Sequence, residues 1–374
     1  MKRVLVLFGG GSVEKDISVI TAIEAIGNID TKKYKVYPIY IADKWYFGNF
    51  ERIEQFCPFD EKLYRRVTLI SGELFEIKGS KIKRMFKPDA ALICTHGGVG
   101  ENGSLQGLLE ANEIPYTSAG VLQSAIGMDK AVSKQIFEGM ILNVPKYFAI
   151  SKSEYEQDKQ KTETYIETFI DYPIVVKPCS QGSSIGISVA HDRAELERGL
   201  ELAFCYGGKA IVEKEIENFV EVNCACYLKN GRIVVSETER PIADGEILSF
   251  ADKYVGGDKS KATRISPADV GDEMNELIKA TSKRIYCETG LRGVVRFDYL
   301  VSGGKIYINE MNTVPGALAN YLFKPLGIDY TSLISDLIEE ADYESKNIKF
   351  DSGVLAYYSG NKVGAKGNTA KPLG

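Results

Sequence analysis

The order of apolar and polar positions predicts an open parallel sheet in the first third of the chain. Three apolar runs are typical of buried parallel strands: 4–8, 36–41 and 90–95. Helices are predicted after the first and third runs, at 16–26, where Gly27 should stop the helix, and at 104–111. Strands alternating with helices indicate a doubly wound α/β domain with ligands at the carboxyl ends of its strands. The polar, weakly periodic section up to about Lys87 is predicted to be a small antiparallel insert.

The remaining pattern predicts shorter strands, charged helices and one long loop. Strands are expected at 172–177, 187–190, 210–214 and 220–228. A charged amphipathic helix covers 151–170, and a helix between 124 and 144 carries Asp129 and Lys130 at its start. The loop 241–267 is rich in Gly, Asp, Ser and Lys. Because loops of this length in compact domains are usually functional, we predict a lid that closes over substrates.

The segment 294–316, VVRFDYLVSGGKIYINEMNTVPG, predicts a β-hairpin with polar side chains at one end. Every second side chain of a strand shares a face, so Arg296 goes with Asp298 and Glu310 goes with Asn312. The two pairs share one face if Arg296 lies opposite Asn312. An Arg, two carboxylates and an amide would then form a cluster.

The length of the turn sets this register. A two-residue turn at Gly303-Gly304 would place Asp298 opposite Asn309, whereas a three-residue loop, 303–305, places Asp298 opposite Glu310. We predict the second register. Facing carboxylates repel unless a cation lies between them, and hard oxygen ligands without His or Cys suit Mg²⁺. The alternative is a solvated hairpin face with incidental charges.

Composition narrows the class of protein. A length of 374 residues predicts two to three domains, and 44% hydrophobic content is sufficient for their cores. The net charge of -5 argues against nucleic-acid binding. No apolar run of about 18 residues occurs, and Met1-Lys2-Arg3 leads directly into a strand, so we expect a cytoplasmic protein without a membrane partner. The seven cysteines include no Cys-x-x-Cys pair, which argues against disulfides and a zinc site. The chain has only two histidines, which argues against histidine-based catalysis.

The first two glycine-rich loops carry candidate polar groups. Glu14 stands where a dinucleotide fingerprint would have its third glycine, and a carboxylate there opposes a pyrophosphate. Glu14 is therefore a candidate for holding an ammonium group, or else a first-turn acid that favours the helix dipole. His96 in the second loop is better explained as a hydrogen-bonding residue that shapes the loop than as a catalyst.

A third loop, 178–186, has the small residues that let backbone N–H groups approach phosphate, and Lys177 adds a charge before it. The loop joins two strands and lacks the Walker A pattern, so an ordinary flexible hairpin is the alternative. A strand end near Glu213 can bind an adenine edge, and Glu221 can bind ribose hydroxyls. The alternative is that Glu213 and Glu221 are ordinary surface charges.

Taken in order, these segments resemble the D-alanine–D-alanine ligase family of ATP-grasp enzymes. The match runs from about residue 4 to residue 326 and rests on GGGSVEKDIS (9–18), HGGVGENGSLQG (96–107), MDK (128–130), VKPCSQGSSIG (176–186), VEKEI (212–216) with Glu221, DKY (252–254), VVRFD (294–298) and NEMNTVPG (309–316). The resemblance implies an α/β protein of the ATP-grasp fold, in which an N-terminal doubly wound parallel domain precedes two α+β subdomains that sandwich ATP. We expect domains at 1–122, 123–208 and 209–345, and a tail at 346–374.

The resemblance also implies a role for each matching residue. Seven would bind ATP: Lys130, Lys177 and Lys253 its phosphates, Glu213 and Lys214 the adenine, Glu221 the ribose, with Ile216 beside them. Five would act on the amino acids: Glu14 on the amino group of the first D-alanine, Ser183 and Tyr254 in a hydrogen-bond chain that closes the lid, and Arg296 and the Gly316 backbone at the oxyanion. Two Mg²⁺ ions, replaceable by Mn²⁺, would be held by Asp298, Glu310 and Asn312.

The implied activity is ATP-dependent synthesis of D-alanyl-D-alanine through a D-alanyl phosphate, for peptidoglycan precursors, by a homodimer. Phosphoryl transfer needs positioning and charge neutralisation more than a protein nucleophile, which fits these residues. Two other classes stay open: a nucleotide-binding protein without turnover, and another ATP-grasp activity such as a carboxylase component. The latter should lack Glu14 and Tyr254.

The chain departs from the family pattern in two places. The family often has a serine for the acceptor carboxylate where this chain reads Ala319-Asn320-Tyr321, so D-serine is an alternative acceptor. D-lactate is disfavoured, because its ligases carry a lid histidine where this chain has Lys253-Tyr254. The tail runs past the family's usual end, and we expect its last ~10 residues to be loosely held.

Overall fold

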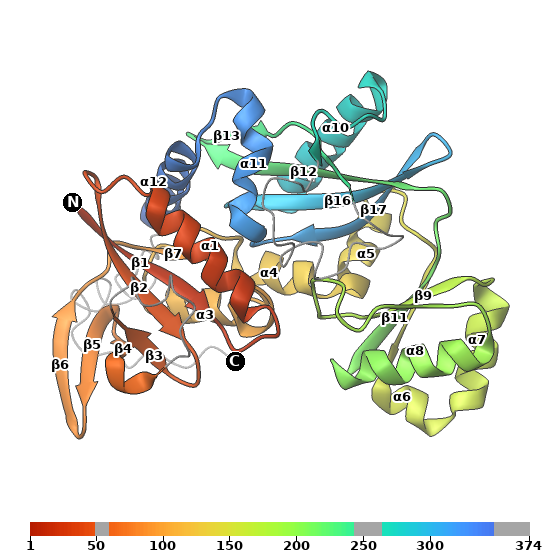
Figure 1. Cartoon of the computed structure of the whole chain (residues 1–374), viewed down its shortest axis with the longest axis horizontal. Coiled ribbons are helices and arrows are strands. Elements are labelled where there is room, and N and C mark those ends of the chain that lie inside the picture. The colour runs from red at the N-terminus through yellow and green to blue at the C-terminus, as the bar shows by residue number, and fades with distance from the viewer. Residues whose placement is uncertain (49–59, 243–263, 348–374) are drawn as a thin grey trace, which may run out of the picture.

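Three β-sheets form the framework of the protein, each from a different part of the chain (Figure 1). The computed structural model describes residues 1–48, 60–242 and 264–347. The three sheets lie within residues 2–93, 147–214 and 220–312. Most of the expected tail and most of the expected lid fall outside the described residues.

The first sheet has seven strands in the order β6-β5-β4-β3-β2-β1-β7. The strands are β1 Lys2–Gly9, β2 Tyr34–Ile41, β3 Trp45–Phe47, β4 Arg65–Ile70, β5 Glu73–Lys78, β6 Lys81–Phe86 and β7 Ala90–Ile93, and a short 3₁₀ helix, η1, covers Glu61–Leu63. β1 runs parallel to β2 and β7, which confirms the predicted parallel strands. β3 to β6 pair antiparallel, which confirms the predicted insert.

The helices of this domain follow the strands as predicted. α3 covers Ser104–Ala111, after a 3₁₀ turn η2 at Gly98–Gly100, and α1 covers Lys15–Asn28. The prediction that Gly27 stops α1 is wrong, because a glycine inside a helix costs only about 1 kcal/mol. Gly9 is needed where β1 ends: its φ is +92°, and a Cβ atom there would lie 2.4 Å from the Ile41 carbonyl oxygen.

The second sheet is antiparallel, in the order β10-β9-β11-β8. Its strands are β8 Tyr147–Ser151, β9 Ile174–Pro178, β10 Ser188–Ala190 and β11 Lys209–Lys214, and its helices are α6 Lys152–Gln157, α7 Lys159–Phe169 and α8 Arg193–Cys205. The single helix expected at 151–170 is two helices. Ser151 caps α6 with a capping box, and Asp158 begins α7 by accepting a hydrogen bond from the Lys161 backbone N–H.

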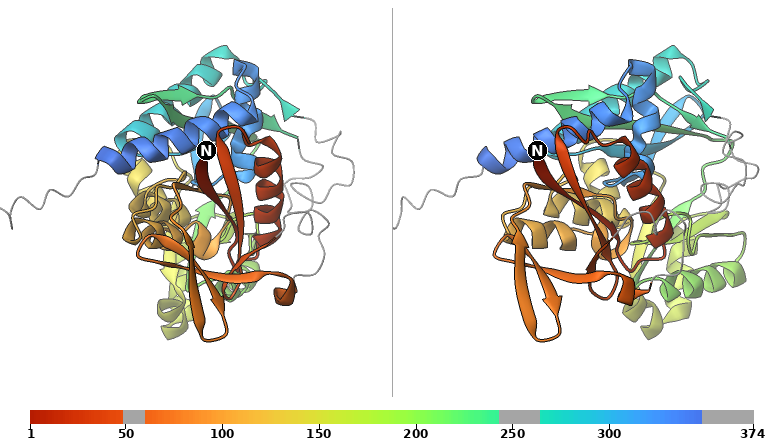
Figure 2. Two further views of the ribbon diagram at one scale, coloured as in Figure 1. Left: turned by 90° about the vertical axis from the view of Figure 1, so that its left-hand side faces the viewer. Right: turned by 60° about the vertical axis from the view of Figure 1, so that its left-hand side comes forward.

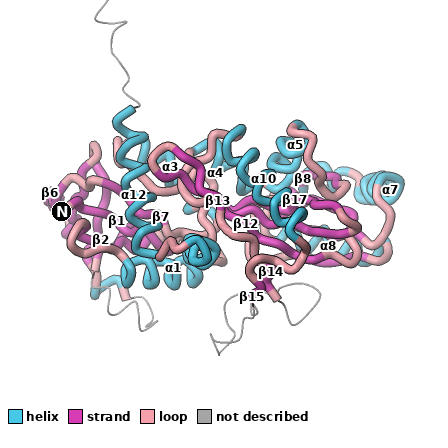
Figure 3. The backbone as a smooth tube through the Cα atoms, turned by 90° about the horizontal axis from the view of Figure 1, so that it is seen from above, coloured by secondary structure: helices cyan, strands magenta, loops and turns pink. Residues whose placement is uncertain are grey.

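The third sheet has the order β13-β12-β16-β17 and is also antiparallel. Its strands are β12 Val220–Lys229, β13 Arg232–Val235, β16 Val295–Ser302 and β17 Lys305–Asn312. A two-stranded ladder, β14 Arg240–Pro241 with β15 Arg264–Ile265, lies beside β12, and helix α10, Asp272–Glu288, packs on β12. Figure 3 shows the second and third sheets on the side of the molecule away from the N-terminus.

The hairpin β16-β17 corrects the predicted turn. Ser302 pairs with Lys305, so the turn contains two residues, Gly303-Gly304, and the three-residue loop is wrong. Asp298 nevertheless lies opposite Glu310, as predicted. A bulge in β17 reconciles the two observations.

The bulge residue is Asn309, and as long as this residue is present in the strand the burial pattern requires a bulge. Ile306 and Ile308 are 9% and 1% exposed and point into the core, whereas Glu310 and Asn312 are less buried. In an uninterrupted strand all four side chains would share one face. The extra residue at Asn309 lets the isoleucines face the core while the two polar side chains face away from it.

Helices connect the three sheets into one body. α4 Val121–Met128 and α5 Lys130–Gly139 lie in the middle of the molecule, and η3 Gly316–Ala319, α11 Asn320–Phe323, η4 Lys324–Leu326 and α12 Tyr330–Asn347 return to the first domain (Figures 1 and 2). One core joins β1, β7 and α12 to Tyr227 of β12, whose ring meets Phe323 edge-on at 5.0 Å. Among the described helices, none is both long and apolar enough to span a membrane.

Candidate active site

Glu14 lies between two glycine-rich loops at the start of α1. It is 7% exposed, and Ser183 Oγ donates a hydrogen bond of 2.5 Å to its Oε1. A Cβ atom on Gly97 would lie 2.4 Å from Oε2, and one on Gly182 would lie 2.7 Å from Oε1. The two loops therefore enclose the carboxylate with backbone. The structure thus brings together the predicted pair Glu14 and Ser183, whereas Tyr254 lies outside the described residues.

A second carboxylate, Glu101, connects two loops that the sequence analysis treated separately. The Gly97 N–H donates to Glu101 Oε2 at 3.0 Å, and the Val314 N–H donates to its Oε1 at 3.1 Å. Burial, together with the negative charges of Glu14 and Glu310, raises the pKa of Glu101 to about 7. No pattern in the sequence singled out Glu101, which stood only as one letter of the motif HGGVGENGSLQG (96–107).

A chain of hydrogen bonds also joins α1 to the loop at Gly316. The Ala317 N–H donates to Thr21 Oγ1 at 3.1 Å, and the same Oγ1 lies 2.9 Å from His96 Nε2. Burial lowers the pKa of His96 to about 4, so the imidazole is neutral at pH 7. Because Thr21 Oγ1 accepts from Ala317, its own proton is available to the histidine. His96 thus supports the loop, in agreement with its expected role.

Lys130 connects the loop 178–186 to the hairpin. Its Nζ donates to the Gln181 carbonyl at 2.6 Å and lies 3.3 Å from Glu310 Oε2. Burial alone would lower the pKa of Lys130, but the charge of Glu310 outweighs it and the pKa is raised. The lysine is therefore charged at neutral pH.

A buried network lies beside it. Lys177 Nζ donates to Glu213 Oε2 at 2.8 Å and to Asn309 Oδ1 at 3.1 Å. Lys134, which the sequence analysis missed, is fully buried; its Nζ lies 3.2 Å from Glu213 Oε1 and donates to the Asn309 carbonyl at 3.1 Å. Burial would raise the pKa of Glu213, but the two lysines lower it. Glu213 Oε1 accepts no hydrogen bond among the described residues. The only available signal for Lys134 was its position four residues after Lys130 on one helix face.

The predicted metal ligands meet at the open end of the hairpin. Asp298 is 3% exposed and accepts two hydrogen bonds from Arg296, at 2.7 Å from Nε and 2.9 Å from Nη2. Asn312 Nδ2 donates to Asp298 Oδ2 at 3.0 Å, and Glu310 lies opposite Asp298 in the ladder. Two carboxylates and one amide are a donor set of the hard oxygen type that fits Mg²⁺. In the described ranges, no group of three or more His, Cys, Asp or Glu side chains is suited to a metal.

The turn that begins at Gly316 has an unusual backbone. Ala317, Leu318 and Ala319 have φ of +49°, +49° and +50°, a left-handed conformation that costs roughly 1–2 kcal/mol per residue. Asn320 is 8% exposed and its Nδ2 donates to the Ala317 carbonyl at 2.9 Å. The amide therefore stabilises this turn rather than facing solvent.

Tyr321 lies between two arginines. Arg296 Nη1 donates to the Tyr321 hydroxyl at 3.4 Å, and the Arg264 guanidinium lies 3.9 Å from the centre of its ring. Arg264 also pairs with Glu239 at 3.1 Å. The region where the family often has a serine is therefore lined by two arginines, each of which also pairs with a carboxylate.

The remaining predicted residues lie near the connection from β11 to β12. Lys214 Nζ donates to the Tyr172 carbonyl at 3.1 Å. Ile216 is half-buried in the connection, and Glu221, near the start of β12, pairs with Leu300 of β16. Lys253, like Tyr254, lies outside the described residues.

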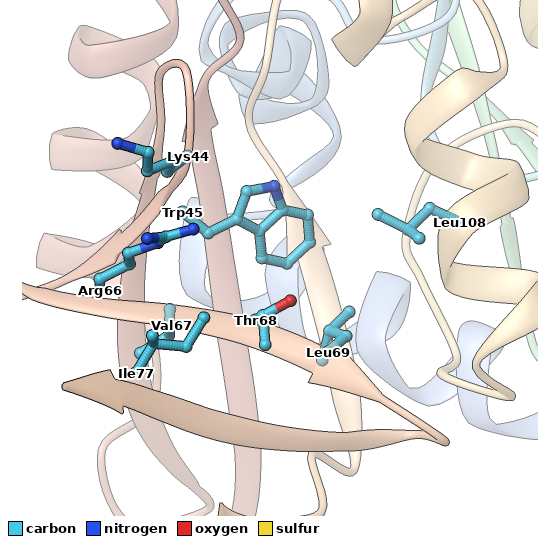
Figure 4. Close-up of a pocket in the computed structure, with 8 residues that line it drawn as sticks. All are labelled: Lys44, Trp45, Arg66, Val67, Thr68, Leu69, Ile77 and Leu108. Atoms are coloured by element: carbon cyan, nitrogen blue, oxygen red, sulfur yellow. The ribbon is translucent and has the colours of Figure 1, made fainter. Parts of the chain in front are cut away.

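A separate pocket of about 190 Å³ lies between the antiparallel insert and α3 (Figure 4). None of the predicted site residues lines it. Its walls are Lys44, Trp45, Arg66, Val67, Thr68, Leu69, Ile77 and Leu108.

The arrangement defines a class of protein. Lys130 of α5 meets Glu310 of the third sheet, and Lys177 of the second sheet meets Asn309 of the third. A glycine- and serine-rich loop lies between Lys130 and Glu14. Such a site can neutralise a polyphosphate and hold an amino group next to it. Together with the sheets, it defines an enzyme of the ATP-grasp fold.

The chain belongs to the D-alanine–D-alanine ligase family. The models "D-ala D-ala ligase N-terminus" and "D-ala D-ala ligase C-terminus" match residues 3–119 and 136–339. A D-alanine–D-alanine ligase of Chloroherpeton thalassium is 37% identical and covers 91% of this chain and 96% of its own length; one of Thermosipho africanus is 35% identical and covers 95% and 98%. The crystal structure of the VanG D-Ala:D-Ser ligase from Enterococcus faecalis has a TM-score of 0.78 at 28% identity, covering 91% of this chain and 99% of its own.

Proposed function

We propose that this protein joins two D-alanines with hydrolysis of ATP to ADP and phosphate. One observation carries the proposal: the loop 178–186 touches Glu14 through Ser183 and Lys130 through the Gln181 carbonyl. A group bound at Glu14 and phosphates bound at Lys130 would therefore lie on either side of one loop. This is the proximity that phosphoryl transfer to an amino acid requires.

In the first step, ATP phosphorylates the first D-alanine. Glu14 holds the ammonium group of the first D-alanine, and the carboxylate of that D-alanine is free to attack the γ-phosphate of ATP. ADP leaves and a D-alanyl phosphate forms. Lys130 and Lys177, with Lys253 from the lid, neutralise the phosphate charge. Glu213 Oε1 lies 3.2 Å from Lys134 but accepts no hydrogen bond among the described residues, so it is a suitable acceptor for the adenine amino group.

In the second step the amine of the acceptor attacks the acyl carbon and loses a proton, and phosphate leaves from the tetrahedral intermediate. Arg296 and the Gly316 backbone stabilise the developing oxyanion. Loss of one such donor typically lowers turnover by about 10²-fold or more. The Thr21 hydroxyl accepts a hydrogen bond from the Ala317 N–H and so stabilises the left-handed turn that follows Gly316.

Asp298, Glu310 and Asn312 would hold Mg²⁺, as two ions, with Mn²⁺ as a substitute. When bound, the metal supplies charge neutralisation of the β- and γ-phosphates. The protein residues that now balance these carboxylates are Arg296 and Lys130.

D-serine is the second candidate acceptor. In the region where the family often has a serine, this chain has Tyr321, whose ring lies against the Arg264 guanidinium. The VanG D-Ala:D-Ser ligase is among the similar structures. We further propose that the chain divides at residues 122 and 345 and between residues 214 and 220, and that the protein is a cytoplasmic homodimer. The separation of the first sheet, within 2–93, from the second supports the division at 122. Because β11, Lys209–Lys214, pairs with β8 and β9 of the second sheet, the second division belongs between 214 and 220 rather than at 208.

The test is phosphate release from MgATP with D-alanine alone, then with D-alanine plus D-serine or D-lactate, with products identified by mass. We expect D-alanyl-D-alanine from D-alanine alone. A mixed D-alanyl-D-serine product in excess would assign the second acceptor. No amino-acid-dependent phosphate release would refute the ligase proposal.

A further inference from the structure

The bulge residue Asn309 has contacts that the hairpin itself does not require. Ser302 to Tyr299 pair with Lys305 to Ile308 in a regular ladder, and pairing resumes between Asp298 and Glu310. Asn309 is the one residue between these two stretches. It lies directly before a predicted metal ligand.

A hairpin without this residue would keep the same faces. If Asn309 were absent, the two-residue turn would still set Asp298 opposite Glu310, and Ile308 and Met311 would still face the core. The extra residue is therefore not needed for register or for burial. What it adds is a set of acceptor groups at one point of β17.

Those acceptors bind two lysines from other elements. Lys134 of α5 donates to the Asn309 carbonyl at 3.1 Å, and Lys177 of β9 donates to its side-chain Oδ1 at 3.1 Å. Both ammonium groups also lie against Glu213, at 3.2 Å and 2.8 Å. Lys134 is fully buried and Lys177 is 8% exposed, so few other groups can compete for these donors.

We propose that Asn309 is a positioning residue that fixes Lys177, and through Lys134 also Glu213, relative to the metal-binding hairpin. Lys177 and Glu213 belong to the second sheet and Asn309 to the third, so the bulge ties together the two sheets that would enclose ATP. This inference rests on the proposed function, which assigns Lys177 to a phosphate and Glu213 to adenine. Lys134 takes part only through its contacts and does not touch substrate.

Two variants remove the contacts in steps. Asn309→Ala keeps the carbonyl for Lys134 but removes the acceptor for Lys177. Deletion of Asn309 removes both acceptors while preserving register and core. Asn143→Ala is the matched control, because Asn143 Nδ2 donates to the Ile306 carbonyl of the same strand at 3.3 Å and to neither lysine.

The first measurement is calorimetric binding of adenosine and of a non-hydrolysable ATP analogue, without metal. Because a hydrogen bond to a charged group is lost, Asn309→Ala should weaken binding of the triphosphate by about tenfold and that of adenosine by less than about threefold. The deletion should weaken both ligands, because Glu213 also loses its fixed partner. Asn143→Ala should bind like the wild type.

The second measurement separates KM from kcat in phosphate release. For Asn309→Ala we expect a higher KM for ATP with an unchanged KM for D-alanine. Equal effects of Asn309→Ala and Asn143→Ala on ATP, or wild-type binding by the deletion variant, would overturn the inference. If the wild type makes no dipeptide, the proposed function fails, but the calorimetry still tests the role of Asn309.

Discussion

Replacing Glu101 with Gln should change how the stability of the protein depends on pH. Burial and the charges of Glu14 and Glu310 raise the pKa of Glu101 from 4.5 to about 7. In the unfolded chain this carboxyl has its ordinary pKa. Between these two values the folded protein keeps a proton that the unfolded chain has released. The contribution of Glu101 to stability is therefore fully present below about pH 4.5 and is lost as the pH rises to about 7.

The size of the effect follows from the width of this window. Each pH unit changes the free energy of unfolding by about 1.4 kcal/mol per proton, so the window corresponds to about 3 kcal/mol. Gln cannot ionise, but its NH₂ group cannot accept from one of the two N–H groups, of Gly97 and Val314, that the carboxyl binds, which costs about 1 kcal/mol at every pH. The stability of Glu101→Gln relative to the wild type should therefore rise by about 2–3 kcal/mol between pH 5 and pH 8.

Urea denaturation between pH 5 and pH 8 measures this difference. The chain has one tryptophan, Trp45, on β3 of the first sheet, and β7 of the same sheet leads into the loop of Glu101, so its fluorescence reports unfolding of the relevant domain. Glu217→Gln is the control, because Glu217 is exposed. A stability difference between Glu101→Gln and wild type that stays constant across this pH range would refute the argument.

Three further substitutions test the site, and a fourth, Gly11→Ala, is a control. Gly97→Ala and Gly11→Ala both place Ala at a φ near +65°, which costs about 1 kcal/mol in each variant. Only the Cβ atom at position 97 would collide with the Glu14 side chain. We therefore expect phosphate release to show a raised KM for D-alanine in Gly97→Ala but not in Gly11→Ala. Ser183→Ala removes a hydrogen bond to that carboxylate and should raise the KM for D-alanine about tenfold while leaving that for ATP unchanged. Glu310→Gln should lower turnover by at least about 100-fold but change the melting temperature little, because the fold loses one partly exposed ion pair; a large fall in melting temperature with normal turnover would show a structural role instead.

Strand alternation and glycine loops were sufficient to predict the parallel strands, the antiparallel insert and the facing of Asp298 and Glu310. They were insufficient for the hairpin turn. Ile306, Ile308 and Glu310 have the same parity along the chain, so no uninterrupted strand can bury the first two and expose the third. The conflict was visible in the sequence, but where the extra residue lies depends on Lys134 and Lys177, which approach from other elements.

The missed residues share a physical cause. Thr21 and Lys134 lie inside helices whose patterns are explained by packing, and Glu101 lies in a loop whose glycines draw attention first. Each acts through a contact with a residue more than 170 positions away. Sequence spacing carries information about neighbours on one strand or helix, but not about such contacts.

The same contacts change the reasoning about charge in the site. Two facing carboxylates were expected to require a metal ion, because they would otherwise repel each other. In the structure Arg296 binds Asp298 and Lys130 lies 3.3 Å from Glu310, so cationic side chains already balance both carboxylates. These are the residues proposed to bind the oxyanion and the phosphates. If Asp298 and Glu310 hold Mg²⁺, Arg296 and Lys130 would lose these partners and become available to the substrates. ATP with Mg²⁺ would therefore exchange partners rather than add charge to an unbalanced site.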